Sequence, residues 1–163
     1  MDFQAEYHAP ESLGIALEDV EFSFVEAVIP RCDAAGTILD FRPQSLYSGR
    51  DTALLHGHGH GAYCKFSITV PRGLMGVYAL VSEGTVLYIG ECVDLAKRFN
   101  AGYGQISPRN TYKDGQPTNC KINQRVLEVA REGGRVSLYF HPTADRKAVE
   151  KRLVRALIPA WNG

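Results

Sequence analysis

Apolar residues recur with two different spacings along the chain, and each spacing predicts one kind of secondary structure. Alternation of apolar and polar residues, typical of strands, occurs at residues 62–70 and 136–140, and residues 22–29, 37–41, 76–81 and 86–90 are also predicted to be strands. The spacing of three and four residues that helices show occurs at residues 10–20, 93–100, 118–132 and 145–158. The chain is therefore predicted to combine strands and helices in an α+β fold.

Residues 1–74 are predicted to form an N-terminal elaboration with both α and β elements. A short helix is expected over residues 10–20, with an apolar face formed by Leu13, Ala16, Leu17 and Val20. The strands at 22–29 and 37–41 flank a four-residue turn at 33–36 and so predict a hairpin. A glycine-rich loop over residues 48–61 then leads to a half-buried strand at 62–70.

Residues 75–163 are predicted to form a module in the order ββααβα. The turn at 82–85 joins the first two strands in a hairpin, and this order predicts a small mixed or antiparallel sheet of three strands flanked by helices. The inward residues of the three helices are expected to be Leu95 and Phe99; Ile122, Val126, Val129 and Ala130; and Val149, Leu153, Ala156 and Leu157. The boundary near Pro71 separates two parts of what we expect to be one compact unit.

Length and composition place the chain among globular proteins. It has 163 residues, 45% of them hydrophobic and 22% charged, which excludes disordered and collagen-like classes. No apolar run approaches the roughly 18 residues that a membrane span needs, and the first residues lack the features of a signal peptide. The four cysteines show no CxxC spacing. We therefore expect a soluble cytoplasmic protein with no membrane partner.

The zero net charge of the whole chain hides an uneven distribution. Residues 76–163 contain 13 Lys and Arg against 8 Asp and Glu, a net charge of +5, and residues 1–75 carry the balancing −5. A basic excess in one half is what a polyanion-binding surface would produce. Ordinary surface charge, unevenly shared, explains the same numbers equally well.

Several residues of the second half are unusual for a purely structural role. Tyr78 and Tyr88 lie in the middle of two strands joined by a turn, so their rings are expected to be near-opposite neighbours. Glu150 borders the apolar face of the last helix, where an unpaired carboxylate is costly. Each of these residues also has an ordinary structural explanation. The two tyrosines could be a core pair, and Glu150 could pair with Arg146. Arg98, on the helix that follows, could likewise pair with Asp94.

Taken together, these residues resemble the GIY-YIG nuclease superfamily. The resemblance covers residues 75–163 and rests on Gly76-Val77-Tyr78, Tyr88-Ile89-Gly90, Arg98, Glu150 and the closing Pro159-Ala160-Trp161-Asn162. Residues 102–110, 115–116 and 118–123 are similar to the subgroup of phage endonuclease II and related restriction endonucleases. Two positions depart from the family pattern: Val77 replaces the Ile of the name motif, and Cys92 stands where Ser is common.

The resemblance implies a metal-dependent DNA endonuclease that hydrolyses phosphodiester bonds. Glu150 would hold a divalent cation, Mg²⁺ or Mn²⁺, since one or two carboxylates together with phosphate oxygens suffice for Mg²⁺. Arg98 would contact the scissile phosphate. Tyr78 would activate or orient the attacking water, and Tyr88 would position it or relay the proton. A restriction or defence role is an extrapolation from relatives.

Two further groups of residues have weaker functional signals. His56, His58 and His60 are spaced by two, which is compatible with a flexible loop, a phosphate contact or a zinc site. The other group suits contacts to the phosphates and base edges of double-stranded DNA and consists of Arg109, Lys113, Asn119, Lys121 and Arg125.

Two alternatives to a DNA endonuclease stay open from sequence. One is a catalytically inactive DNA-binding or interaction module with the same fold. The other is a structure-specific repair nuclease or an RNA nuclease. Cleavage of both strands by a single type of active site favours a homodimer or a higher homo-oligomer with two-fold symmetry.

Overall fold

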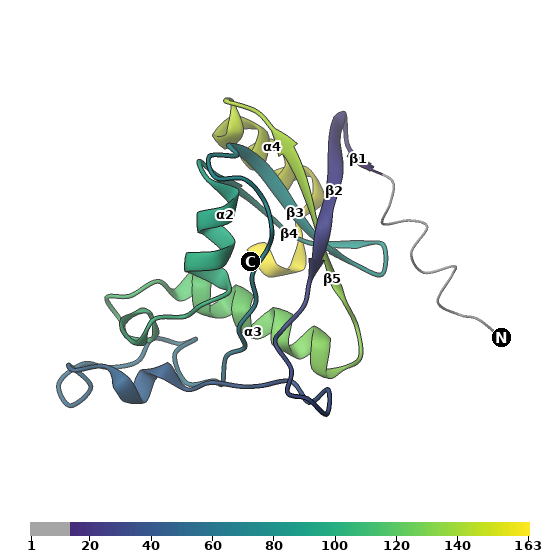
Figure 1. Ribbon diagram of the computed structural model, residues 1–163. Helices are drawn as coiled ribbons and strands as arrows, with labels where there is room; N and C mark the ends of the chain where they lie inside the picture. Colours follow the sequence, from purple (N-terminus) through teal and green to yellow (C-terminus); the bar gives the residue numbers. More distant parts are fainter. Residues whose placement is uncertain (1–13) are drawn as a thin grey trace. The chain divides into compact units, whose positions relative to one another are not determined.

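The computed structural model describes residues 14–163 and shows the predicted mixture of strands and helices (Figure 1). The strands are β1 Ile15–Leu17, β2 Val20–Val28, β3 Gly76–Ser82, β4 Thr85–Cys92 and β5 Val136–Pro142. The α-helices are α2 Leu95–Arg98, α3 Pro117–Arg131 and α4 Arg146–Leu157. Shorter helical turns are η1 Pro43–Leu46, the π-helical η2 Phe99–Tyr103, η3 Pro108–Thr111 and η4 Ala160–Asn162.

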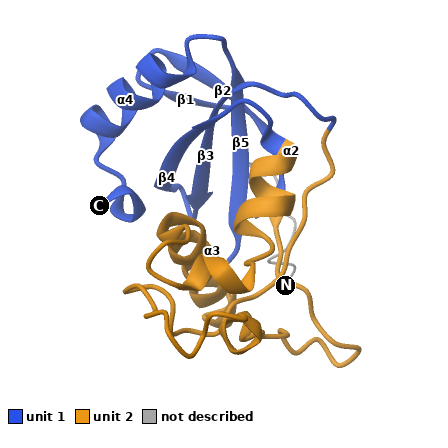
Figure 2. Cartoon of the chain, turned by 90° about the vertical axis from the view of Figure 1, so that its left-hand side faces the viewer, with its two compact units in different colours: residues 1–27, 71–95, 135–163 blue, residues 28–70, 96–134 orange. Residues whose placement is uncertain are grey.

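The chain divides into two compact units, which Figure 2 shows in two colours. Unit 1 consists of residues 71–95, 135–163 and the described residues up to 27, and it contains the sheet and α4. Unit 2 consists of residues 28–70 and 96–134 and contains α3. Each unit takes residues from both sides of position 75. Within residues 14–163, no helix is both long and apolar enough to cross a membrane.

The sheet of unit 1 has five strands in the order β1-β2-β5-β3-β4. The pairs β1–β2, β3–β4 and β3–β5 are antiparallel. The predicted number of strands, three, was therefore too small, because β1 and β2 from the N-terminal part extend the sheet beyond β5. The hairpin β3–β4 has its turn at Glu83 and Gly84, which both have positive φ, as a tight hairpin turn requires.

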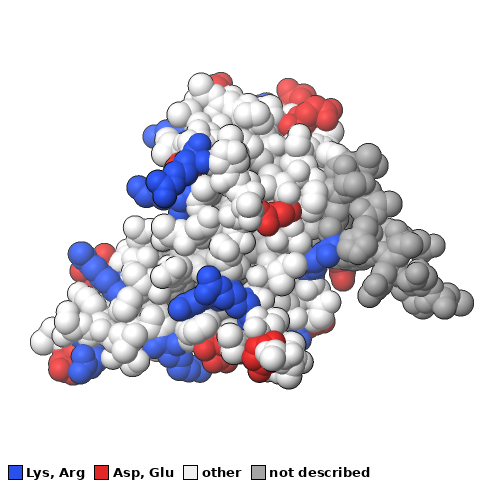
Figure 3. Space-filling view, in the orientation of Figure 1, with Lys and Arg blue, Asp and Glu red and all other residues white. Residues whose placement is uncertain are grey.

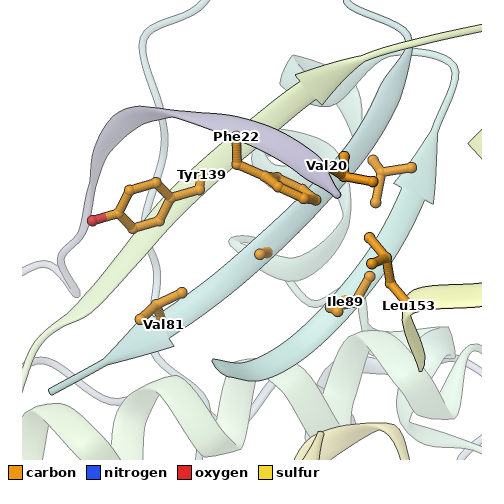
Figure 4. Packing of buried hydrophobic residues seen from close by; sticks show 8 residues of the cluster. Val20, Phe22, Val81, Ile89, Tyr139 and Leu153 are labelled. Atoms are coloured by element: carbon orange, nitrogen blue, oxygen red, sulfur yellow. The ribbon is translucent and has the colours of Figure 1, made fainter. Parts of the chain in front are cut away.

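Side chains on one face of the sheet, including those at the start of β2, form an apolar core with α4. Figure 4 shows Val20 and Phe22 of β2 and Leu153 of α4 over the same strands. The sheet contributes Val77, Ala79, Val81, Ile89 and Tyr139, all buried. The opposite face of β3 and β5 carries Tyr78, Leu80, Leu138 and Phe140, which are buried as well. Burial on both faces explains why β3 and β5 are almost continuously apolar.

The helix predicted over residues 10–20 is wrong wherever the structure describes this segment. Residues 15–17 and 20–28 form the hairpin β1–β2, in which Leu17 pairs with Val20. Glu18, at the turn, has a φ of 55°. The sequence offers no Gly or Asn at that turn, so the spacing of apolar residues was mistaken for a helix. The part of the prediction on residues 10–13 lies outside the described residues.

The strands predicted at 37–41 and 62–70 are also wrong, although the turn between Asp33 and Thr37 forms. Both segments are extended, but they pair only through the single bridges Cys32–Ile38 and Phe41–Tyr63. Burial alternates from Cys64 to Thr69, with Phe66 and Ile68 inside, whereas Tyr63, expected on the polar face, is buried as well.

Side-chain amides take the place of a partner strand along residues 62–70. Asn123 accepts from the Cys64 amide and donates to the Cys64 and Tyr103 carbonyls. Asn100 makes the same pair of bonds to Ile68. These bonds satisfy buried backbone groups that would otherwise be costly.

The three helices of the second half form close to their predicted places. Helix α2 begins at Leu95, two residues after the predicted start, and both Leu95 and Phe99 are fully buried. Helix α3 begins at Pro117, and Gln116 precedes it without a side-chain cap. In α4, Leu153 is buried, whereas Ala156 is exposed, contrary to prediction. The helix ends where Ile158 adopts a left-handed conformation.

Candidate functional site

Tyr78 and Tyr88 lie on the same face of the β3–β4 hairpin. Their ring centroids are 6.2 Å apart, with an angle of 42° between the ring planes. They are diagonal neighbours rather than opposite ones, because Tyr78 pairs with Gly90 and Tyr88 pairs with Leu80. Tyr78 is buried and Tyr88 is half-buried. The predicted neighbourhood of the two rings is therefore present, with a different register.

An irregularity in the hairpin brings the two tyrosines to one face. Near the turn Val81 pairs with Val86, but the next pair is Leu80 with Tyr88, so Leu87 is an extra residue in β4. Without it, Tyr88 would pair with Ala79 and point to the face opposite Tyr78, because side chains alternate along a strand. The bulge is thus part of the site geometry, as bulges near functional groups often are.

The glycines that flank the tyrosines allow close approaches. A Cβ added to Gly90 would lie 2.4 Å from the Tyr78 hydroxyl oxygen and from Cζ. A Cβ added to Gly76 would lie 2.1 Å from the His141 carbonyl oxygen. Neither glycine has a positive φ, so both are needed for space rather than for backbone conformation.

Asn162 binds the backbone of β4 between the tyrosine and the glycine of that strand. Its amide nitrogen donates to the Ile89 carbonyl at 2.8 Å, and its carbonyl oxygen accepts from the Ile89 amide at 3.0 Å. Because β4 is the last strand in the sheet order, these two groups have no strand partner on that side. The closing Asn motif of the sequence therefore fastens the edge of β4.

Glu150 lies on α4 close to Glu91 of β4. Partial burial raises the pKa of the Glu150 carboxyl, and the negative charge of Glu91 raises it further. Arg146, one turn before Glu150, forms an ion pair with Glu91 and not with Glu150. The alternative in which Arg146 pairs with Glu150 is therefore not what the structure shows.

Three consecutive residues of the edge strand are the meeting point of these groups. Asn162 binds Ile89, Tyr78 crosses Gly90, and Glu150 lies near Glu91. Side chains alternate along β4, so Glu91 is on the opposite face from Tyr88. Tyr78 and Glu150 therefore lie near adjacent residues of β4, the edge strand of the sheet.

Arg98, the fourth predicted catalytic residue, ends α2 and belongs to unit 2. It is half-buried. The helix widens into the π-helical turn η2 immediately after it, and Phe99 packs edge-to-face on Tyr103 with ring centroids 5.3 Å apart. Segments of π-helix are rare and occur often at functional positions.

The carboxylates near β4 fit a divalent cation by their chemistry. Glu150 and Glu91 offer the oxygen ligands that Mg²⁺ prefers, and Mg²⁺ takes few ligands from protein when phosphate and water supply the rest. The raised pKa of Glu150 reflects an environment that disfavours its negative charge, which a cation would relieve. No group of three or more His, Cys, Asp or Glu suited to a metal occurs within residues 14–163.

The residues predicted to bind nucleic acid differ in exposure. Arg109 is exposed and pairs with Asp114, and Arg125 is exposed and pairs with Glu128. Lys113 is exposed and Lys121 is half-buried. Asn119 is only 6% exposed, and its amide donates to Gln116. Its burial is unfavourable for the predicted base contact.

On the face seen in Figure 3, Lys and Arg side chains form several separate groups, and Asp and Glu side chains lie beside some of them. Uncharged surface lies between the groups. The basic excess of residues 76–163 thus produces no continuous basic patch on this face.

The histidines of the loop at 56–60 are not gathered into a three-ligand metal group in the described part of the chain. The Nε2 atom of His56 lies 2.5 Å from the Asn110 carbonyl oxygen, while Nδ1 accepts from the His58 amide. Both ring nitrogens of His56 are therefore occupied. Burial lowers the pKa of His58, and the charges of Lys121, His56 and Arg125 lower it further.

Sequence reasoning missed Glu91 and its ion pair with Arg146. The sequence carries one signal for Glu91: it directly follows the Tyr-Ile-Gly motif, so it must lie on the strand beside Gly90. Its nearness to α4 depends on tertiary packing and has no local signal.

Comparisons with known proteins find a similar fold among the solved structures. No protein-family model matches the sequence, and no curated protein matches it. The structure of a mutant of bacteriophage T4 EndoII is similar to this chain, with a TM-score of 0.50 and 20% sequence identity. The similarity covers 68% of this chain and 87% of that chain. At this identity the likeness concerns the fold, and it agrees with the α+β class expected from the sequence.

Proposed function

We propose that this chain is a metal-dependent endonuclease that hydrolyses phosphodiester bonds in double-stranded DNA. The observation that carries the proposal is the convergence of Tyr78, Glu150 and Asn162 on residues 89–91 of the edge strand. The fold shared with a phage EndoII supports it, as does the sequence resemblance to GIY-YIG nucleases. The bulge that brings the two tyrosines to one face agrees with it, because bulges are over-represented next to active sites.

Tyr78 is the residue proposed to orient and deprotonate the attacking water. Its hydroxyl lies above Gly90, at the edge of the sheet, although the residue as a whole is buried. An ordinary tyrosine has a pKa near ~10, so a nearby positive charge is required for the phenolate. Tyr88, diagonal to it at 6.2 Å, would relay the proton or hold the water.

Glu150 is proposed to hold the divalent cation, Mg²⁺ or Mn²⁺, with Glu91 beside it. When bound, the cation would supply charge neutralisation for the scissile phosphate. Arg146 forms an ion pair with Glu91 and so holds this second carboxylate beside Glu150. Arg98 is proposed to bind the phosphate through its guanidinium group, which donates two parallel hydrogen bonds.

Double-strand cleavage by one type of site would require two copies of the chain, so a homodimer or higher homo-oligomer is part of the proposal. A restriction or defence role in the cytoplasm is its biological extension. The exposed cations Arg109, Lys113 and Arg125, with Lys121, are the proposed backbone contacts.

Incubation of the purified protein with supercoiled and linear duplex DNA in Mg²⁺ tests the function. The Glu150→Ala variant is the inactive control, and Glu132→Ala, which removes an exposed carboxylate, is the matched active one. Discrete fragments from the wild type and Glu132→Ala only are expected. Salt-sensitive binding without cleavage in any divalent cation would favour an inactive binding module. Cleavage confined to branched DNA or to RNA would show that the substrate is one of these and not ordinary duplex DNA.

A further inference from the structure

Unit 2 contains a pocket of about 590 Å³ that the proposed catalytic residues do not use. It lies between the segments around Phe41, Tyr63 and Ile106. Its volume is within the range of pockets that hold one small-molecule-sized group. Of these lining residues, Tyr63 and Ile106 are buried and Phe41 is half-buried.

The charged part of the pocket lining is cationic. Arg42 and Lys65 contribute to it, and the lining includes no Asp or Glu. The Lys65 ammonium lies 4.2 Å from the centroid of the Phe41 ring. Within residues 14–163, no carboxylate forms an ion pair with Arg42 or Lys65. Arg42 also donates from Nη1 to the His60 carbonyl oxygen at 3.3 Å. Both cations lie beside apolar walls and have no carboxylate partner, so an anionic ligand can pair with their charge.

Neutral hydrogen-bonding groups complete the lining. The side chains of Gln105 and Ser107 are exposed there, and neither is engaged in a side-chain bond within the described part of the chain. An amide offers a donor and an acceptor, and a hydroxyl offers both roles. Such groups match the edge of a nucleobase, whereas a purely apolar ligand would leave them unsatisfied.

We propose that this pocket receives one unpaired nucleotide of the DNA strand, with the base against Phe41 and the phosphate at Arg42 and Lys65. The proposal rests on DNA being the substrate, as argued above. Aromatic walls combined with cations are the usual means of holding single-stranded nucleotides. A nucleotide outside the helix presents its flat face and its Watson–Crick edge, which a paired nucleotide does not.

Two duplexes of about 20 base pairs test the proposal, one fully paired and one with a single unpaired 2-aminopurine. Binding is measured in EDTA, so that cleavage does not interfere. The wild type is expected to bind the bulged duplex about 5- to 20-fold more tightly, as one stacked base contributes. Phe41→Leu and Lys65→Gln should each reduce this preference to about twofold or less, with affinity for the paired duplex nearly unchanged.

Arg50→Ala is the matched control, because it removes an exposed cation of the same unit that does not line the pocket. It should keep the full preference. Lys65→Gln keeps the proposal testable if Phe41→Leu fails to fold. Equal binding of both duplexes by the wild type, or an unchanged preference in both pocket variants, would overturn the pocket assignment. Cleavage of paired DNA in Mg²⁺ would still stand in that case, so the two proposals fail separately.

Discussion

Tyr78 lies directly across the ladder from Gly90, and its ring occupies the space where any other residue at position 90 would place a Cβ. The tyrosine is 1% exposed, so its ring cannot swing aside. The hydroxyl is therefore held at the sheet edge by packing, which is how a rigid scaffold positions a reacting group.

Substitution Gly90→Ala should displace this ring. Overpacking of this kind costs about 1–3 kcal/mol, and we expect the melting temperature to fall by about 3–10 °C and DNA cleavage to be lost. Gly57→Ala is the control, because no atom lies within 4 Å of the added Cβ there. Thermal unfolding and a cleavage assay check both effects. A Gly90→Ala variant with normal stability and activity would show that the close approach of Tyr78 to Gly90 is required for neither.

The amide of Asn123 should be among the most important single groups for the stability of unit 2. It is fully buried and bonded to the backbone of Cys64 and Tyr103. Asn123→Ala leaves these buried groups unsatisfied, which we expect to lower the free energy of unfolding by about 3 kcal/mol or more. Gln124→Ala, the half-buried neighbour on α3, should change it by less than about 1 kcal/mol. Equal decreases in the free energy of unfolding for the two variants, measured by urea unfolding, would contradict this role of Asn123.

Asn162 should matter more for activity than for stability. It is half-buried near the C-terminus, and it fixes the edge strand between Tyr88 and Gly90. Asn162→Ala is expected to lower the free energy of unfolding by about 1 kcal/mol while reducing kcat about 10-fold or more, since small misplacements of catalytic groups are costly. A kcat equal to that of the wild type would show that the hydrogen bonds between Asn162 and Ile89 do not position the site.

Glu150 should destabilise the fold at neutral pH. Burial, together with Glu91, raises its pKa in the folded chain, so the folded state holds this proton at pH values where the unfolded chain has released it. Stability then falls as pH rises from the ordinary carboxyl value through the raised one. Glu150→Gln should therefore raise the melting temperature by about 1–2 °C at pH 7.5 and leave it unchanged near pH 3.5.

The exposed carboxylate variant Glu132→Gln is the control for this measurement. It should show no pH-dependent gain. If Glu150→Gln were less stable than the wild type at pH 7.5, the carboxylate would be a stabilising group, and its proposed role as a cation ligand held at a cost in stability would lose its support.

The second half of the fold could be predicted because its signals are local. Gly84 marks the β3–β4 turn, and the apolar spacing around Ile122 and Leu153 defines α3 and α4. The bulge at Leu87 has no such signal, since it depends on packing across the sheet. The tyrosine pair was thus predicted with the correct neighbours and the wrong register.

The first half resisted prediction for two physical reasons. The β1–β2 turn uses Glu18 with a positive φ, a conformation that few side chains adopt and no sequence pattern announces. Residues 64–69 have the alternating burial of a strand, but the backbone of Cys64 and Ile68 bonds to the side chains of Asn123 and Asn100 from far along the chain. Alternating burial alone therefore does not define a strand. Glu91 was missed because its relation to Glu150 is tertiary.

The most direct test of the account is the effect of Tyr78→Phe, which removes one hydroxyl and little else. Single-turnover cleavage of duplex DNA in Mg²⁺ and DNA affinity are measured side by side, with Tyr47→Phe, a half-buried tyrosine of unit 2, as control. We predict that Tyr78→Phe cleaves at least about 100-fold more slowly, with DNA affinity within about twofold of the wild type, and that Tyr47→Phe behaves normally. Near-normal cleavage by Tyr78→Phe would contradict the account, because the hydroxyl above Gly90 would then have no part in the reaction.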